Sequence, residues 1–129
     1  MMKRMKKLLT ILLTALGLNS AYGQNFENLE VESFANVVKD SNVVILDVRT
    51  ANEYAESHLR GAINIDQFEE DFMEKVKARL LADKTIAIYC RSGRRSANAC
   101  GRLAAEGYKC VNLKGGILAW TKIGYPVTR

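Results

Sequence analysis

The sequence predicts a single α/β domain with a mostly parallel central sheet of about five strands and helices on both faces. Short β-branched apolar runs at 43–46 and 85–89 are typical of strands buried on both faces, as in parallel sheets. Segments with helical spacing of apolar residues alternate with these runs. Such alternation is the pattern of a parallel sheet that is covered on both sides.

The first 23 residues are predicted to be a secretory signal peptide that precedes the domain at 24–129. Four basic residues precede the apolar run 8–18, and Ala21-Tyr22-Gly23 has the small-x-small form of a cleavage site. A membrane span needs about 20 residues, and this apolar run is shorter. The alternative to a signal peptide is an uncleaved membrane anchor. We expect cleavage after Gly23, or less favourably after Ala21, and export, most simply to a bacterial periplasm.

Removal of this segment changes the charge of the protein. The formal net charge of +5 falls to +1, because residues 1–23 hold four basic and no acidic residues. The remaining Lys and Arg are scattered among carboxylates, without a basic stripe that carries stacking aromatics. We therefore expect no nucleic-acid partner, and no membrane association beyond the signal peptide.

In the first half of the domain, strands are expected to alternate with short helices. The expected elements are an edge strand within 24–29, a helix around 34–38, a central strand at 42–48, a helix through residue 56 and a strand at 62–65. Thr50 and Glu53 have the spacing of a capping box, in which each side chain accepts a hydrogen bond from the other residue's backbone N–H. This pair predicts that the second helix begins after Thr50.

The next helix is predicted to begin after Asp66, which has a side chain suited to an N-cap. Phe68, Phe72, Val76 and Leu80 follow at intervals of one helical turn, so they are expected to share one face. We interpret that face as core packing.

The second half contains the most informative segment. A strand is predicted at 85–89, a helix at 94–106, a strand at 108–113 and a helical segment at 117–121 that packs Trp120 in the core. The apolar face of the longer helix is expected to consist of Ala97, Cys100, Leu103 and Ala104. These small residues would let the helix lie close to the sheet.

Cys90 is predicted to be a nucleophile in the turn between the strand 85–89 and the helix that follows. Arg91, Arg94 and Arg95 place three guanidinium groups within five residues of the thiol. Arginine charges and the N–H groups of a helix N-terminus favour the thiolate and lower the pKa of a cysteine. The alternative is a half-buried structural cysteine with solvated arginines around it.

The other cysteines and the single histidine carry less information. Three cysteines in an exported protein leave at least one thiol without an internal partner. Cys100 and Cys110 could form a disulfide, but we favour two small buried residues, because bridging depends on geometry that sequence does not contain. With no second histidine or cysteine at ligand spacing near His58, we expect no metal site and no cofactor.

Three segments of this chain resemble the signatures of single-domain rhodaneses, and the resemblance extends from about residue 31 to 127. The first segment is Asp47-Val48-Arg49 with Glu53-Tyr54, His58-Leu59 and Gly61-Ala62-Ile63-Asn64-Ile65; the second is Cys90-Arg91-Ser92-Gly93-Arg94-Arg95-Ser96; the third is Leu113-Lys114-Gly115-Gly116 with Trp120 and Gly124-Tyr125-Pro126. They follow the family's order and spacing. One departure is Ser57, where the family commonly has glycine.

The resemblance implies a sulfurtransferase in which Cys90 carries a persulfide. The thiolate would take the outer sulfur of thiosulfate, or of a persulfide or polysulfide donor, and pass it to cyanide or a thiol. The partners implied are small sulfur-containing anions and thiol acceptors, with a protein sulfur acceptor as a further candidate. In the family, the histidine at position 58 belongs to the scaffold rather than to the catalytic groups.

The resemblance also assigns roles within the loop. Backbone N–H groups from Arg91 through Ser92, Gly93 and Arg94 to Arg95 are expected to cradle the anionic persulfide, as a helix N-terminal nest does. Arg91 and Arg95 are the candidates for binding the donor, while Arg94 is expected either to help them or to be a solvated surface charge.

Three further residues are expected to support the loop without touching the substrate. Asp47, Arg49 and Glu53 all lie in the first signature segment. A purely structural role, as an ion pair at a strand end and a helix cap, would explain the presence of these three residues equally well.

Two other functions remain open from the sequence. A cysteine phosphatase or arsenate reductase of related fold would need a loop one residue longer, with arginine six positions after the cysteine. Here Arg95 lies five positions after Cys90 and Ser96 follows it, which favours sulfur transfer. A periplasmic persulfide carrier or redox-binding module that serves a protein partner is the alternative from another class.

Overall fold

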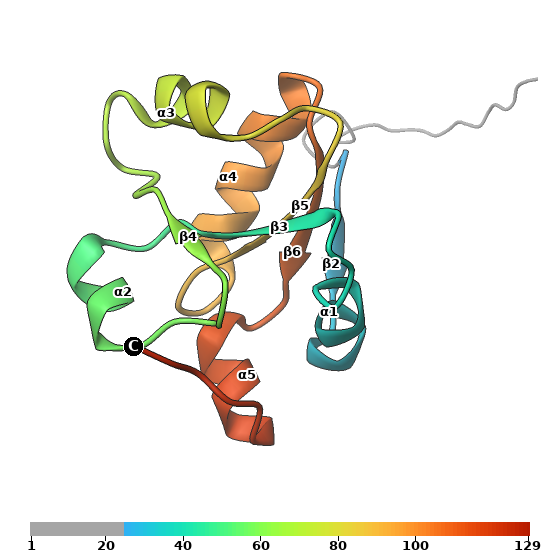
Figure 1. The fold of residues 1–129 in the computed structure, drawn as a ribbon, viewed down its shortest axis with the longest axis vertical. Helices are drawn as coiled ribbons and strands as arrows, with labels where there is room; N and C mark the ends of the chain where they lie inside the picture. The colour runs from blue at the N-terminus through green and yellow to red at the C-terminus, as the bar shows by residue number, and fades with distance from the viewer. Residues whose placement is uncertain (1–24) are drawn as a thin grey trace, which may run out of the picture.

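The computed structural model describes residues 25–129, which form a five-stranded sheet. Figure 1 shows helices on both sides of this sheet. The predicted signal peptide lies outside the described residues. All neighbouring strands are parallel, in the order β2-β6-β5-β3-β4. In chain order the elements are β2 (Glu27–Leu29), α1 (Val31–Val37), β3 (Val43–Asp47), α2 (Ala51–Glu56), β4 (Ile63–Asn64), α3 (Phe72–Arg79), β5 (Thr85–Tyr89), α4 (Arg94–Ala105), β6 (Lys109–Leu113) and α5 (Gly116–Ile123).

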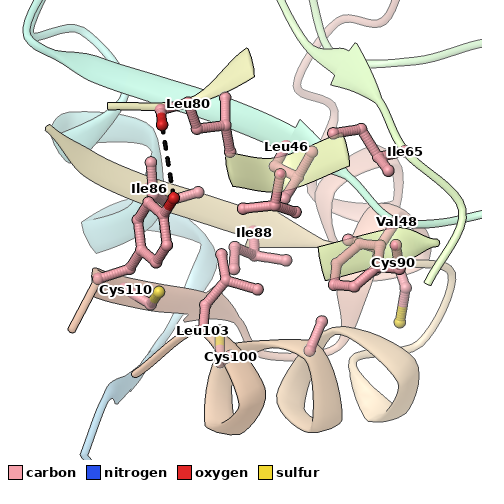
Figure 2. Close-up of a cluster of buried hydrophobic side chains, with 14 residues drawn as sticks. Leu46, Val48, Ile65, Leu80, Ile86, Ile88, Cys90, Cys100, Leu103 and Cys110 are labelled. Atoms are coloured by element: carbon pink, nitrogen blue, oxygen red, sulfur yellow. Dashed lines mark hydrogen bonds between the residues drawn. The ribbon is translucent and has the colours of Figure 1, made fainter. Parts of the chain in front are cut away.

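Each face of the sheet buries its own apolar cluster. Helices α3 and α4 cover one face, where Phe72, Val76 and Leu103 belong to one buried apolar cluster. The same cluster contains Leu46 of β3 and Ile86 and Ile88 of β5, which Figure 2 labels together with Leu103. Helices α1 and α5 cover the other face, where Phe34 and Trp120 pack edge to face. The predicted α/β class, with a parallel sheet and helices on both faces, is therefore confirmed.

Strand β5 lies at the centre of the sheet, and Cys90 directly follows it. From β3 the chain continues outward to β4, whereas from β5 it continues in the opposite direction to β6. The connections after β3 and β5 therefore diverge at the carboxyl ends of two adjacent strands. In open parallel sheets this switch point is where ligands bind.

The strand predicted as central, 42–48, lies in the interior of the sheet, but it does not have strand neighbours on both sides along its full length. Its neighbour β4 has only two residues and pairs with Leu46 and Asp47. The first three residues of β3 therefore have a strand neighbour on one side only, and they are half-buried. The strand predicted at 24–29 is the edge strand β2, as expected.

Helix α3 begins later than the sequence predicts. The Asp66 carboxylate accepts a hydrogen bond from the N–H of Phe68 at 2.9 Å, which closes a turn rather than opening a helix. Such local side-chain bonds compete with helix formation. Phe68 consequently lies outside α3 and is exposed, whereas Phe72, Val76 and Leu80 are buried as expected.

Helix α4 presents a slightly different face to the sheet from the one predicted. Its buried residues are Ser96, Ala99, Cys100 and Leu103, while the predicted Ala97 and Ala104 are only half-buried. A polar serine thus faces inward at the first turn. Its position is explained by the thiol of Cys90, described below.

The cysteines form no disulfide within the described chain, and all three are buried. Cys100 on α4 and Cys110 on β6 belong to the same apolar cluster, in which Cys90 lies at the opposite end from Cys110 (Figure 2). The interaction between the Cys100 and Cys110 thiols, followed by burial, raises the pKa of Cys100. Both are small buried side chains, as the sequence analysis favoured.

The C-terminal segment returns to the residues that follow α2 (Figure 1). His58 and Thr128 exchange two backbone hydrogen bonds, each 2.8 Å long, and the His58 ring stacks on Tyr54. Over residues 25–129, none of the helices combines the length and apolar character needed to cross a membrane.

Candidate active site

The thiol of Cys90 lies in a turn whose backbone folds back around the sulfur. Cys90 is 1% exposed, at the carboxyl end of β5. The N–H of Gly93 donates to Sγ at 3.1 Å, and the buried hydroxyl of Ser96 donates to it at 3.3 Å. Gly93 has φ of +101°, a left-handed conformation that suits glycine and turns the chain into α4.

These hydrogen bonds outweigh the effect of burial on the thiol. Burial by itself would raise the pKa of Cys90, because a low-dielectric environment disfavours the thiolate. The hydroxyl of Ser96 and the N–H groups of Ser96, Gly93 and Ser92 act in the opposite direction, and the pKa of Cys90 is lowered. The first turn of α4 therefore favours a sulfur nucleophile in its reactive, ionised form.

Helix α5 holds the other side of this turn. The N–H of Ile117 donates to the carbonyl of Cys90 at 2.9 Å, and the N–H of Leu118 donates to the carbonyl of Arg91 at 3.1 Å. Gly116 makes this approach possible, because a Cβ there would collide with the carbonyl group of Arg91. Gly116 is thus required by close packing on the cysteine turn, whereas a Cβ at Gly115 would collide with Ala119.

A buried polar network fixes the strand end that carries Cys90. The Asp47 carboxylate accepts a hydrogen bond from the Tyr89 hydroxyl at 2.6 Å and from Arg49 Nη2 at 2.7 Å. Arg49 Nη2 also donates to the carbonyl of Ser57, and the Tyr89 hydroxyl accepts from the N–H of Leu59. The network therefore joins the ends of β3 and β5 to the segment that follows α2.

Glu53 connects the capping box of α2 to the cysteine loop. Its carboxylate accepts from the N–H of Thr50 at 3.0 Å, while its own N–H donates to the Thr50 hydroxyl. The same carboxylate binds Arg95 in a bidentate ion pair, with distances of 2.8 and 2.9 Å. This pair, more than any other contact, lowers the pKa of Glu53 to about 2.

The three arginines of the loop differ in their surroundings. Arg95 is held by Glu53, and its pKa is raised first by that ion pair and to a smaller extent by the charge of Cys90. Arg91 and Arg94 are exposed, and within the described chain neither is paired with a carboxylate. Within the described chain, the loop therefore has two arginines without a carboxylate partner and a third that Glu53 holds.

The structure thus brings together most of the residues that the sequence singled out. Cys90, Ser92, Gly93 and Arg95 lie in one turn, and Glu53 reaches that turn through Arg95. Asp47 and Arg49 contact each other and Tyr89, so they act on the loop only through the end of β5.

Sequence reasoning gave no role to Ser96, Tyr89 or the backbone of α5. Ser96 ends the second signature segment and argues against a phosphatase loop, but its direct contact with the sulfur was not predicted. The signal that could have identified it is a serine at the first turn of a helix on the side that should be apolar. Nothing local in the sequence indicates the contacts of Tyr89 or Ile117, because they join distant segments.

Among residues 25–129, the remaining titratable groups indicate no second reactive centre. In the part of the chain that the structure describes, no three His, Cys, Asp or Glu side chains cluster closely enough to hold a metal ion. His58 Nδ1 donates to the Tyr54 carbonyl at 2.9 Å, a bond within the scaffold. A cavity of about 640 Å³ lies at the opposite end of the sheet, beside Val43, Thr85 and Lys109, away from Cys90.

Comparisons with known proteins give matches that extend over most of the described domain. The model of the rhodanese-like domain family matches residues 30–123. A sulfurtransferase of Allochromatium vinosum is 34% identical over 101 residues, which are 77% of this chain and 92% of that protein. Thiosulfate sulfurtransferase 18 of Arabidopsis thaliana is 35% identical over 107 residues, covering 74% of this chain and 79% of the relative. The crystal structure of a rhodanese-related protein from Thermoplasma volcanium has a TM-score of 0.72 and 32% identity, covering 80% of this chain and 98% of that chain.

Replacing Ser96 by alanine is expected to make Cys90 less reactive at neutral pH. The variant loses the hydroxyl that donates to Sγ, so the pKa of Cys90 rises and the fraction of thiolate falls. The rate of alkylation by iodoacetamide at pH 7 should fall roughly three- to tenfold, and its pH profile should move to higher pH. Ser92→Ala, which removes an exposed hydroxyl from the same loop, is the control and should keep the wild-type profile.

Replacing Glu53 by glutamine is expected to remove a contribution to folding stability that the wild-type protein has at neutral pH and loses in acid. Because the pKa of Glu53 is about 2 in the folded protein and 4.5 ordinarily, its contribution is complete above pH 4.5 and is lost as the pH falls towards 2. Urea unfolding from pH 7 to 2 should show Glu53→Gln less stable by ~1–2 kcal/mol at pH 7, allowing for solvent screening, with a flatter acid limb. Glu56→Gln, on the exposed side of the same helix, should follow wild type; equal slopes in all three proteins would contradict the assignment.

Proposed function

The chain belongs to the rhodanese-like domain family, and we propose that it is a sulfurtransferase that carries sulfur on Cys90 as a persulfide. The observation that supports this most directly is the hydrogen bonding of Cys90 Sγ by Gly93 N–H and Ser96 Oγ–H, which lowers the pKa of the thiol. A sulfur nucleophile requires the thiolate, and a persulfide is itself an anion that the same donors stabilise.

The first half-reaction uses thiosulfate or a related persulfide or polysulfide donor. The Cys90 thiolate attacks the outer sulfur of thiosulfate, and a sulfur–sulfur bond forms between them. The original sulfur–sulfur bond of thiosulfate breaks, and sulfite leaves with its electron pair. Because sulfite is a stable anion, no general acid is needed, which agrees with a loop that has neither histidine nor carboxylate at the thiol. The exposed Arg91 and Arg94 and the nearby Arg95 attract the donor anion.

The second half-reaction transfers the outer sulfur to an acceptor. Cyanide or a thiolate attacks that sulfur, and the sulfur–sulfur bond to Cys90 breaks with its electron pair returning to Cys90. The products are thiocyanate, or the persulfide of the acceptor thiol, and the starting thiolate. Electrons balance without an external oxidant, and the two substrates react in turn, so ping-pong kinetics are expected.

The inward-facing Ser96 also bears on the choice between sulfur and phosphate transfer. A phosphatase loop of related fold would have arginine at this position to bind a tetrahedral oxyanion. Here the position holds a buried serine whose hydroxyl donates to Cys90 Sγ, and the neighbouring Arg95 is held by Glu53. The site is therefore suited to a single sulfur atom beside the thiol rather than to a bound phosphate group.

Residues 1–23 support a further proposal about location. Their basic start, apolar run and small-x-small end have the composition of a signal peptide, so we propose that the domain acts outside the cytoplasm, most simply in a bacterial periplasm. N-terminal sequencing of the mature protein from its native cell fraction tests this. A mature N-terminus near Gln24 agrees with the proposal, and an intact Met1 in the cytosolic fraction contradicts it.

Intact mass of the non-reduced protein tests the persulfide cycle. Thiosulfate should add one sulfur atom to the wild-type protein, and cyanide should then remove it. Cys90→Ser should gain no sulfur, whereas Cys100→Ala, which changes another buried cysteine, should gain it normally. Sulfur transfer by Cys90→Ser would falsify the mechanism. A persulfide that forms but passes only to a protein partner would instead indicate a carrier.

A further inference from the structure

Glu53 binds the end of the Arg95 side chain that would otherwise be open to an anionic sulfur donor. The two terminal nitrogens of the guanidinium, Nη1 and Nη2, donate to the two carboxylate oxygens at 2.8 and 2.9 Å. Arginine binds phosphate and similar oxyanions in the same bidentate way. Within residues 25–129, Glu53 is the only hydrogen-bond acceptor of the Arg95 side chain. An oxyanion therefore cannot bind this end of Arg95 while the ion pair is intact.

The Glu53 carboxylate is itself fixed by the start of α2. Its Oε1 also accepts hydrogen bonds from the N–H of Thr50 at 3.0 Å and from the Thr50 hydroxyl at 3.1 Å. If Arg95 turned towards a donor, the carboxylate would stay in the capping box and would lose its charged partner. That loss is costly for a side chain that is only 28% exposed. We therefore expect the ion pair to persist when an anion enters the site.

The charges around Arg95 leave little free positive charge at this position. The pKa of Arg95 is raised first by its hydrogen bonds with Glu53, and to a smaller extent by the negative charges of Cys90 and Asp66. A donor beside Cys90 consequently meets a nearly neutral ion pair rather than a free cation. The guanidinium groups of Arg91 and Arg94 still attract anions, but both side chains are exposed and are screened by salt.

We propose that Glu53 selects the sulfur donor of the Cys90 site by neutralising Arg95. Coulomb energy is proportional to charge, so the carboxylate disfavours a doubly charged donor such as thiosulfate twice as strongly as a singly charged donor at the same place. The favoured donor class is a sulfane-sulfur anion with one charge, such as the persulfide of a thiol. Its sulfur–sulfur bond breaks when Cys90 takes the outer sulfur, and the electron pair leaves with the donor's own thiolate.

This selection makes Glu53 a positioning residue, because it acts on the donor only through Arg95. The choice of donor rests on the proposed sulfurtransferase function, whereas the effect on anion binding does not. A different role for Glu53 would be to orient Arg95 so that its remaining N–H groups bind the donor. The two roles predict opposite results when only the charge of Glu53 is removed: neutralisation predicts tighter anion binding, and orientation predicts weaker binding.

Sulfate and methanesulfonate test the charge effect without turnover, because they share a tetrahedral group of oxygens and differ by one charge. Their dissociation constants can be measured at pH 7 and constant ionic strength from the N–H resonance of Gly93, which lies beside Cys90 Sγ, in ¹⁵N-labelled protein. Relative to wild type, Glu53→Gln should bind sulfate about tenfold and methanesulfonate about threefold more tightly. A sulfate affinity that is unchanged or weaker in Glu53→Gln overturns the proposal.

Two further variants separate the charge of Glu53 from its structural role. Glu56→Gln removes an exposed carboxylate from the same helix and changes the net charge by the same amount, so it should keep both wild-type affinities. Glu53→Asp retains the charge on a shorter side chain and should restore weak sulfate binding. If Glu53→Asp binds sulfate as tightly as Glu53→Gln, the charge is not the cause and the proposal fails.

Thiosulfate and benzenethiosulfonate extend the test to sulfur transfer, with cyanide as the acceptor. Both compounds donate an outer sulfur, but thiosulfate carries two negative charges and benzenethiosulfonate carries one. In Glu53→Gln, kcat/KM for thiosulfate should rise about threefold relative to kcat/KM for benzenethiosulfonate, mainly through a lower KM. Equal changes for the two donors would contradict the selection of donors by Glu53.

The binding and kinetic measurements separate this inference from the proposed function. Turnover of both donors with the same preference in wild type and Glu53→Gln would reject the role of Glu53 alone. Tighter sulfate binding by Glu53→Gln, without turnover of either donor by the wild-type protein, would instead support the charge effect and reject the sulfurtransferase function.

Discussion

The packing of the first turn of α5 against the peptide groups of Cys90 and Arg91 is the constraint on which the site depends. Two carbonyls of the cysteine turn accept hydrogen bonds from Ile117 and Leu118, so that turn is fixed before α4 begins. The N–H groups that follow are then directed at Sγ rather than at those carbonyls. Gly116 is required because any Cβ would collide with the Arg91 carbonyl, which explains why a glycine so distant in sequence belongs to the reactive centre.

Two other contacts hold the same loop from different directions. The buried Asp47 carboxylate fixes the end of β5 through the Tyr89 hydroxyl, and Glu53 fixes the start of α4 through Arg95. Neither carboxylate contacts the sulfur. Asp47 also forms an ion pair at a strand end, and Glu53 also caps a helix. At both positions the same side chain therefore supports the loop and stabilises the fold.

Local patterns in the sequence were sufficient for most of the fold. Apolar β-branched runs located β3 and β5, and the Thr50 and Glu53 pair located the start of α2. The predicted start of α3 was wrong, because the helical spacing of apolar residues does not reveal the competing turn at Asp66. At the site, the turn around Cys90 could be predicted, since charge and helix position are local. The contacts of Ser96 and Tyr89 could not, because they depend on how separate elements meet.

The central claim is that the geometry imposed by α5 makes Cys90 a nucleophile, and the pH profile of Cys90 alkylation in Gly116→Ala tests it most directly. Gly124→Ala is a matched control: Gly124 also has positive φ at an end of α5, but a Cβ there meets no neighbouring atom. Both variants should lose stability from the backbone strain. We predict that only Gly116→Ala raises the pKa of Cys90 and slows its alkylation at pH 7. A folded Gly116→Ala protein with the wild-type profile would contradict the account.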